Sequence, residues 1–306
     1  MRRLAIPVLV AFTIISSIGL SKAFGEDQPW RDQLEQWRTQ HAADLSAPEG
    51  WLTVVGLEWL KPGDNSFGTA PDNKIHLNAS GNSHFGIIHV DANGLDLKAP
   101  QEGFPSGLQV DGHPAREQSI VVEGRSPTKF TTGTLTFFVI KRGDGNALRI
   151  KDSQAPARLS FKGLHWYAPD PTYKIEAEWA PFPEPKPALI HTVIGTTEKG
   201  FSAGVAKFTL HGQQVELQTV VQNLGVNTLL FVIRDATSGH TTYEASRFLH
   251  TGLPDHGLQN PGKIVLDFNR LENPPCAFTP YATCPLPPDS NRLKVPILAG
   301  ELRFDH

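Results

Sequence analysis

The stretch TLTFFVIKRGDGNALRIK, residues 134–151, decides the fold class of this chain. Thr134 to Lys141 and Ala147 to Lys151 are rich in aliphatic and aromatic residues, and Arg142 to Asn146 between them contains two glycines. Two apolar runs of strand length on either side of a short Gly- and Asp-containing segment are typical of a β-hairpin. We therefore predict two antiparallel strands joined by a tight turn.

Strand signals of the same kind fill most of the chain. Between Tyr173 and Trp179 apolar and charged residues alternate, which is the period of a half-buried strand. The four prolines between Pro181 and Pro187 indicate a loop or an edge, because proline cannot donate to a sheet. Other strands are expected at Trp51–Leu60, Ile75–Leu77, Phe85–Val90, Leu95–Leu97, Ile190–Thr196, Gly204–Leu210, Gln214–Val221, Thr228–Arg234 and Lys263–Phe268. We predict a mainly β fold, an antiparallel sandwich or half-open barrel.

One amphipathic helix is expected near the N-terminus. Trp30, Leu34, Trp37, His41 and Leu45 recur at spacings of three and four, so they share one helix face. We interpret His41 as a residue of that face rather than as a ligand. The predicted organisation is a helix over residues 24–48, a small β unit over 49–125, and a larger antiparallel β domain over 126–306 that carries the site.

Residues 1–23 have the pattern of a secretory signal peptide. Arg2 and Arg3 precede an apolar run from Leu4 to Leu20, and Ser21-Lys22-Ala23 offers a cleavage site. A membrane anchor is the alternative, but the run is short for a spanning helix. We expect an exported protein, periplasmic or secreted, with no stable membrane insertion after cleavage.

Charge and composition exclude several partners and cofactors. Loss of residues 1–23 would remove two arginines, one lysine and no acid, and would lower the formal net charge from −3 to −6. An acidic chain argues against nucleic acid as a partner. The one methionine is Met1, so the processed chain has no methionine ligand, and neither CxxC nor HExxH is present. We expect no cofactor and no metal site.

The candidate functional segment is residues 262–301, GKIVLDFNRLENPPCAFTPYATCPLPPDSNRLKVPILAGE. A strand is followed by a long, proline-rich loop, and long loops are uncommon unless they are functional. The loop contains Cys276 and Cys284. In an exported protein we expect these to form a disulfide, which would contribute about 2–3 kcal/mol. A reactive thiol and a pair of metal ligands are the alternatives.

Three segments resemble a known family. They are DATSGHTTYEASRFL at 235–249, LDFNRLENPPCAFTPYATCPLPPDSNRL at 266–293, and AGE at 299–301. Together they are similar to a large bacterial family, domain of unknown function 1684. The resemblance implies an antiparallel β fold and a shared site, and it supplies no activity.

The polar residues of these segments are the candidate site. Arg247 and Arg270 could each hold a carboxylate or phosphate in a bidentate pair. The predicted ligand-binding residues are Arg247, Arg270, Tyr243, Asn269, Tyr281 and Asn291. The candidates for acid–base catalysis are Asp267, Glu301 and Glu244.

These residues support three hypotheses of function. The first is an exported protein that binds a small anionic ligand in a pocket of the larger β domain. The second is a hydrolytic enzyme at the same site, with a carboxylate as acid or base and arginines that stabilise negative charge. The third is a structural module of the cell envelope, in which the polar cluster is an internal ion-pair network.

Overall fold

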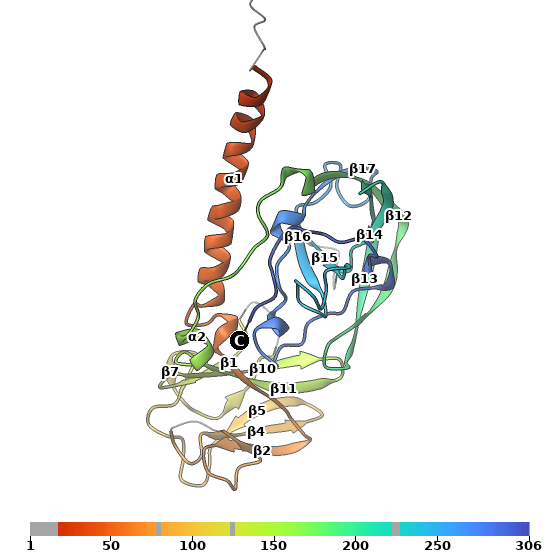
Figure 1. Cartoon of the computed structure of the whole chain (residues 1–306). Coiled ribbons are helices and arrows are strands. Elements are labelled where there is room, and N and C mark those ends of the chain that lie inside the picture. Colours follow the sequence, from red (N-terminus) through yellow and green to blue (C-terminus); the bar gives the residue numbers. More distant parts are fainter. Residues whose placement is uncertain (1–17, 78–80, 123–125, 222–226, 306) are drawn as a thin grey trace, which may run out of the picture.

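One long helix and two β-rich lobes make up the protein (Figure 1). The computed structural model describes residues 18–77, 81–122, 126–221 and 227–305, with the side chains of the first helix described from Gln28. Most of the predicted signal peptide, residues 1–17, therefore lies outside the described residues. In the part of the chain that is described, no helix is both long and apolar enough to span a membrane.

The smaller lobe is a sandwich of two sheets. Its strands are β1 (Val54–Trp59), β2 (Gly63–Gly68), β3 (Ile75–His76), β4 (Gly86–Asp91), β5 (Gly94–Lys98), β6 (Gln109–Val110), β7 (His113–Pro114), β8 (Gln118–Ser119), β9 (Lys129–Thr132), β10 (Leu135–Arg142) and β11 (Gly145–Asp152). One sheet has the order β1-β11-β10-β9-β6-β7 and the other β3-β2-β4-β5-β8. Phe67, Phe85, Phe130 and Phe137 pack between the sheets, which is why the lobe has a core of its own.

The predicted hairpin is β10 and β11, paired from Leu135 with Asp152 to Arg142 with Gly145. Strands from both sides of residue 125 share the first sheet, because β11 pairs with β1 and β9 pairs with β6. The domain limits at 125 and 126 stay a prediction, and pairing in this sheet crosses them.

The larger lobe begins after β11. Its elements are α2 (Pro156–Leu159), η2 (Pro171–Tyr173), β12 (Lys174–His191), β13 (Thr197–Leu210), β14 (Gln213–Gln218), β15 (Leu229–Ile233), β16 (Arg247–Thr251), β17 (Gly262–Asp267), η3 (Phe268–Arg270), η4 (Pro275–Ala277) and η5 (Asp289–Asn291). A sheet of order β14-β13-β12-β17 packs against the hairpin β15-β16. In both lobes the described strands pair antiparallel, except for the parallel pair β2 and β3 of the smaller lobe. These strands form no closed barrel. The mainly β prediction is confirmed.

The proline segment is part of a strand, and at these residues β12 pairs with β13 alone, which is an edge, one of the two predicted placements. Pro181 to Pro187 lie inside the long strand β12, and its pairing with β13 is interrupted between Pro181 and Lys186. A bulge lets the strand continue where prolines have no N–H to donate. The chain therefore passes through this segment without leaving the sheet.

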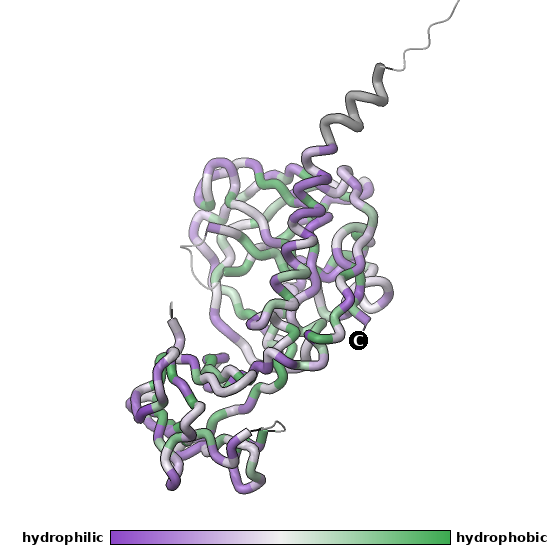
Figure 2. Tube along the Cα trace, turned by 90° about the vertical axis from the view of Figure 1, so that its left-hand side faces the viewer, coloured by the Kyte–Doolittle hydropathy of each residue, from purple (hydrophilic) through white to green (hydrophobic). Residues whose placement is uncertain are grey.

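The N-terminal helix α1 (Ile18–Leu45) is longer than expected and lies along the larger lobe (Figure 2). Trp30, Leu34, Arg38 and Leu45 are buried on one side of it. The Trp30 indole Nε1 donates to Asp267 Oδ2 at 2.8 Å, and Arg38 donates to the carbonyl of Tyr167 at 3.2 Å. The helix is thus held by hydrogen bonds as well as by apolar packing.

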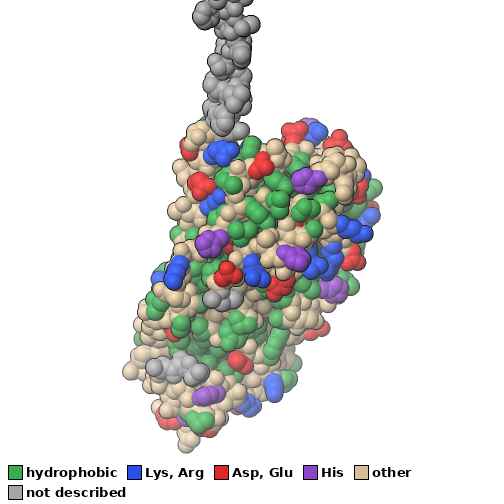
Figure 3. Space-filling view, viewed as in Figure 1, with side chains coloured by type: hydrophobic (Ala, Val, Ile, Leu, Met, Phe, Trp, Pro, Cys, Tyr) green, Lys and Arg blue, Asp and Glu red, His purple; other side chains and the backbone are tan. Residues whose placement is uncertain are grey.

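Charges of both signs are interspersed on the face of the molecule that Figure 3 shows. On the described residues of the face in Figure 3, Lys and Arg alternate with Asp and Glu among apolar side chains. That face has no continuous basic stripe of the kind that follows a nucleic-acid backbone.

Candidate functional site

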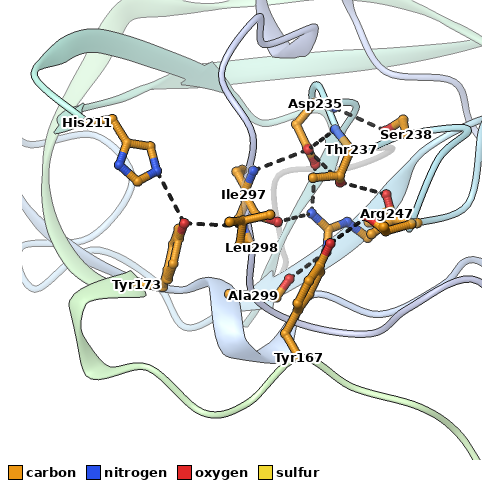
Figure 4. Close-up of polar contacts among 12 residues, drawn as sticks. Tyr167, Tyr173, His211, Asp235, Thr237, Ser238, Arg247, Ile297, Leu298 and Ala299 are labelled. Carbon is orange, nitrogen blue, oxygen red and sulfur yellow. Dashed lines mark hydrogen bonds and ion pairs between the residues drawn. The ribbon is translucent and has the colours of Figure 1, made fainter.

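Arg247 is at the centre of a buried hydrogen-bond network (Figure 4). It starts strand β16, and its Nη1 donates to the carbonyl of Ala299 at 2.5 Å. Its Nη2 donates to Asp235 Oδ2 at 2.7 Å and to the carbonyl of Ile297 at 3.0 Å. The guanidinium therefore joins β16 to the C-terminal segment and offers no exposed surface to a ligand.

Asp235 completes this network from the end of β15. Its Oδ1 accepts from the backbone and the hydroxyl of Thr237, at 2.8 and 2.7 Å, and from the backbone of Ile297 at 3.3 Å. Both partners of the ion pair are at most 1% exposed. For Arg247, the architectural alternative fits these contacts better than ligand binding.

Two asparagines that were predicted to bind a ligand form hydrogen bonds with other segments of the protein instead. Asn291 donates to the carbonyls of Gln218 and Val232, and its Oδ1 accepts from the backbone of Gln218. Asn269 exchanges hydrogen bonds with the main chain of Asp170, at 2.9 and 2.8 Å. Each side chain ties separate segments together, as a buried amide does when all its groups are used.

The predicted carboxylates are placed differently from one another. Asp267 accepts from Trp30, and Asn273 donates to both oxygens of Glu301 from its amide and its backbone, at 2.8 and 2.9 Å. Glu301 is fully buried, whereas Glu244 is exposed. Asp267 and Glu301 thus have structural partners within the protein.

Arg270 and the two tyrosines complete the predicted set. The Arg270 guanidinium lies over the ring of Trp37 at 5.5 Å, with Nε 3.8 Å from Asp267 Oδ2. Tyr243 donates to the carbonyl of Cys276 at 3.1 Å, and Tyr281 is 36% exposed. These residues are spread over several surfaces and do not line one pocket.

The predicted disulfide is not formed, because both cysteines are free. The backbone N–H of Cys276 donates to Sγ of Cys284 at 3.1 Å. A hydrogen bond from Cys284 lowers the pKa of Cys276, and the same contact together with burial raises the pKa of Cys284. The pair is a thiol contact, not a covalent link.

A cavity of about 770 Å³ is lined in part by Thr283 and Pro285, the two residues that flank Cys284 in the chain. Its walls are mostly apolar, and its lining comprises Leu189, Ile190, Val220, Val221, Leu230, Val232, Leu286, Pro285, Pro287, Pro288, Thr192, Thr228, Thr283, Gln218, Arg142, Arg292, His191, His250, Glu198 and Asp289. The loop after Cys284 forms one wall, so the segment expected to carry function does reach a cavity. None of the predicted ligand-binding or catalytic residues lines it.

Charged side chains lie at this cavity in two pairs. Arg142 is the last residue of β10 in the smaller lobe, and its Nε donates to Thr283 Oγ1 at 2.6 Å and lies 3.7 Å from Glu198. Arg292 lies 3.5 Å from Asp289, whose side chain is fully exposed. A pair as exposed as the second holds its arginine weakly, so Arg292 can turn to a ligand.

A third guanidinium lies buried behind the first. Arg149 on β11 is 5% exposed and stacks on Trp51 at 5.0 Å. Among the described residues, nothing accepts a hydrogen bond from its Nε or its Nη2. Burial and the charge of Arg142 lower its pKa to about 10, which still leaves it charged at neutral pH. This uncompensated charge makes the region more positive.

Four titratable side chains form a chain between the cavity and helix α1. His250 Nε2, from the cavity lining, lies 3.5 Å from Glu272 Oε1. Glu272 Oε2 lies 3.3 Å from His41 Nδ1, and His41 Nε2 lies 3.4 Å from Glu301 Oε2. Burial raises the pKa of Glu272 to about 7, with His41 opposing and Glu301 adding to the shift.

Sequence reasoning missed Glu272 and did not connect it with the histidines around it. From sequence alone, His41 is a residue of a helix face, His250 belongs to no metal-ligand pattern, and Arg142 belongs to the predicted turn. These residues come from segments far apart in the chain, and no local spacing links them. The one available signal was the position of Glu272 inside the segment at 266–293 that resembles the family.

Comparison with known proteins places the larger lobe in a family without a described activity. Residues 159–302 match the family described as "Protein of unknown function (DUF1684)". A solution NMR structure of an uncharacterized protein from Haloarcula marismortui is 32% identical. That match covers 47% of this chain and 78% of the other, with a TM-score of 0.41. No curated protein matches the chain.

His250, Glu272, Glu301 and most of the cavity lining fall within the matched residues, whereas His41 and Arg142 precede them. The same residues contain all three segments that carried the resemblance. Through residues 159–302, the chain belongs to the DUF1684 family.

Proposed function

We propose that this chain is an exported protein that binds a small anionic ligand with an apolar body in the cavity of the larger lobe. One observation carries the proposal. A mostly apolar cavity of about 770 Å³ has two guanidinium groups in its lining and a third, unpaired, behind them. Concave, mainly apolar sites with a few polar groups are the usual form of small-molecule sites.

The apolar walls support a ligand with a hydrocarbon part. Leu189, Leu230 and Leu286 contribute to them, and the three prolines after Cys284 hold the opposite loop in extended backbone. Leu189 is 65% exposed, so its side chain is open to a ligand in the cavity. Removal of such surface from water would favour binding by about 25 cal/mol per Å².

The balance of charge supports an anionic head group. The lining has two arginines, Arg142 and Arg292, and two acids, and the buried charge of Arg149 next to Arg142 gives the region an excess of positive charge. Arginine presents a planar set of donors that fits a carboxylate or a phosphate. An anion here would also compensate the buried charge of Arg149, which is costly when unpaired.

The test uses octanoate as the probe and 1-octanol as the uncharged probe of matched length. We expect titration calorimetry of the protein without residues 1–23 to detect octanoate binding, and at least about tenfold weaker binding of the alcohol. Arg292→Gln should weaken octanoate binding about tenfold and leave the alcohol unaffected.

Arg303→Gln is the matched control. Arg303 is 50% exposed and lies 3.8 Å from Asp305, much as Arg292 is 44% exposed and lies 3.5 Å from Asp289, but it does not line the cavity. It should bind octanoate as the unaltered chain does. Equal affinity for acid and alcohol, or an equal loss in both variants, would contradict the proposal.

A further inference from the structure

The chain from His250 to Glu301 has the geometry of an acid–base site. His250 and Glu272 come from adjacent backbone segments, because Phe248 and Glu272 exchange main-chain hydrogen bonds of 2.8 and 3.0 Å. His250 is two residues beyond Phe248, on the same face of β16. That face carries residues of the cavity lining, since Leu230 pairs with His250 and Val232 with Phe248.

The inner members of the chain are held rigidly. The ring of His41 stacks on Trp37, with centroids 5.4 Å apart, and meets the edge of Trp166 at 6.0 Å. Glu301 is fixed by its two hydrogen bonds from Asn273. Glu272 is therefore placed between two histidines, one exposed toward the cavity and one fixed under the helix.

Attachment of α1 does not account for this arrangement. Trp30, Arg38 and the apolar contacts of Leu34 and Leu45 already hold the helix. Buried charges are poor stabilisers compared with apolar packing. His250 is 53% exposed and is not needed to fix His41, yet its Nε2 lies 3.5 Å from Glu272 Oε1.

We propose that His250 and Glu272 form an acid–base pair that hydrolyses a carboxylic ester bond in an anionic ligand bound in the cavity, and that His41 and Glu301 position Glu272. The inference rests on the proposed function, because the substrate must occupy that cavity. Nothing besides water is required as a second reactant.

The step balances with water as the nucleophile. His250 accepts a proton from water through Nδ1 while the water oxygen forms a bond to the ester carbonyl carbon. The bond from that carbon to the alcohol oxygen then breaks, and His250 returns the proton to the leaving oxygen. Glu272 holds the proton of Nε2 in place and stabilises the imidazolium that forms between the two transfers.

The protonation states fit this role at neutral pH. Burial and the charge of His41 hold the pKa of His250 below its ordinary value, so its ring is available as a base. Glu272 becomes ionised as the pH rises through about 7 and then accepts from His250. The titratable groups that face Glu272 are His250 of β16, His41 of α1 and Glu301 of the C-terminal segment.

The substrate for the test is the mono-4-nitrophenyl ester of suberic acid, which carries a carboxylate, a hydrocarbon chain and an ester. We expect release of nitrophenol to increase with pH, with a midpoint near pH 7. His250→Asn should lower the rate at least about 100-fold, the usual contribution of a positioned base. His256→Asn is the matched control, because His256 is 67% exposed and lies 3.7 Å from Asp255, away from the cavity lining.

His41→Gln distinguishes positioning from simple support. The charge of His41 lowers the pKa of Glu272, so its loss should move the midpoint of the profile to higher pH and preserve the rate at pH 9. An equal loss of rate at every pH would overturn the positioning role.

Two results separate this inference from the proposal beneath it. Octanoate binding without cleavage of the suberate ester, or full activity of His250→Asn, would overturn the acid–base pair and preserve the binding site. Absence of both octanoate binding and cleavage would overturn both proposals.

Discussion

At the scale of single residues, the molecule uses its buried arginines in two different ways. Arg247 has an ionised partner and two carbonyl acceptors for its two Nη atoms, so its charge is paired inside the protein, although its Nε has no acceptor among the described residues. Arg149 has no acceptor for two of its nitrogens among the described residues. The first is architectural, and the second is the buried charge that the proposed anion would compensate.

Arg247→Ala should therefore destabilise the fold rather than remove a ligand contact. It would leave the Asp235 carboxylate buried without its partner, which typically costs about 3–5 kcal/mol. Arg234→Ala, in which an exposed arginine loses one hydrogen bond to the carbonyl of Glu244, should change stability by about 0.5 kcal/mol or less. Urea unfolding of both variants measures the difference, and equal midpoints would show that the network is not structural.

The residue scale also shows where single-sequence reasoning ends. The types of residue at 247, 269 and 291 indicated ligand binding, because an arginine or asparagine in a loop-rich segment has spare donors. Whether those donors are used depends on carbonyl groups from distant segments, such as Val232 for Asn291. No local sequence pattern shows which distant carbonyl group a side chain will reach.

At the scale of elements, local sequence predicts where the strands form, and the proline segment shows what a partner strand adds. The alternation in Tyr173 to Trp179 and the Arg142–Asn146 turn were decided by local chemistry, and both were predicted well. The prolines of β12 predict a loop or an edge, because each lacks a donor. In the sheet the bulge between Pro181 and Lys186 accommodates them, and only the partner strand β13 determines that.

Helix α1 is joined to the larger lobe by a contact that should depend on pH. Glu272 has a pKa of about 7 in the folded chain against an ordinary value of 4.5. Because the folded state binds the proton of Glu272 more tightly than the unfolded state, this proton stabilises the fold. Its contribution to the free energy of unfolding is complete below about pH 4.5 and is lost as the pH rises through 7. The pKa of His41 is also raised despite burial, through its hydrogen bond to Glu301 and the charge of Glu272, so its contribution is lost in the same direction.

We expect the unaltered chain to lose about 2–3 kcal/mol more stability than Glu272→Gln between pH 5 and pH 8. The glutamine is neutral at both pH values, so the stability of the variant has no pH dependence from this position. Urea unfolding at the two pH values gives the comparison. Parallel losses in both proteins would mean that Glu272 ionises as freely in the folded chain as in the unfolded one.

At the scale of the whole molecule, the candidate site needs more than the family domain. Arg142 reaches the cavity from the smaller lobe, and His41 reaches Glu272 from helix α1, so both come from outside residues 159–302. A buried hydrogen bond of 2.9 Å from Thr279 to the carbonyl of Val54 also joins the two lobes. The cavity is thus a product of the assembled chain.

Export is a prediction at the same scale. Cleavage after Ala23 would shorten α1 at its start and keep Trp30, Leu34, Arg38 and His41, the residues through which it contacts the lobe. We expect the protein recovered from outside the cytoplasm of its host to have the mass of residues 24–306 and the fold intact. Recovery of the full-length chain from the cytoplasm would contradict the predicted leader.

The most direct test of the central claim is a crystal structure with 8-bromooctanoate, whose bromine can be located by anomalous scattering. The account predicts bromine in the cavity among Leu189, Leu230 and Leu286, with the carboxylate at Arg142 or Arg292. Bromine at another surface, or none at a concentration that saturates binding in solution, would contradict the claim that this cavity is the ligand site.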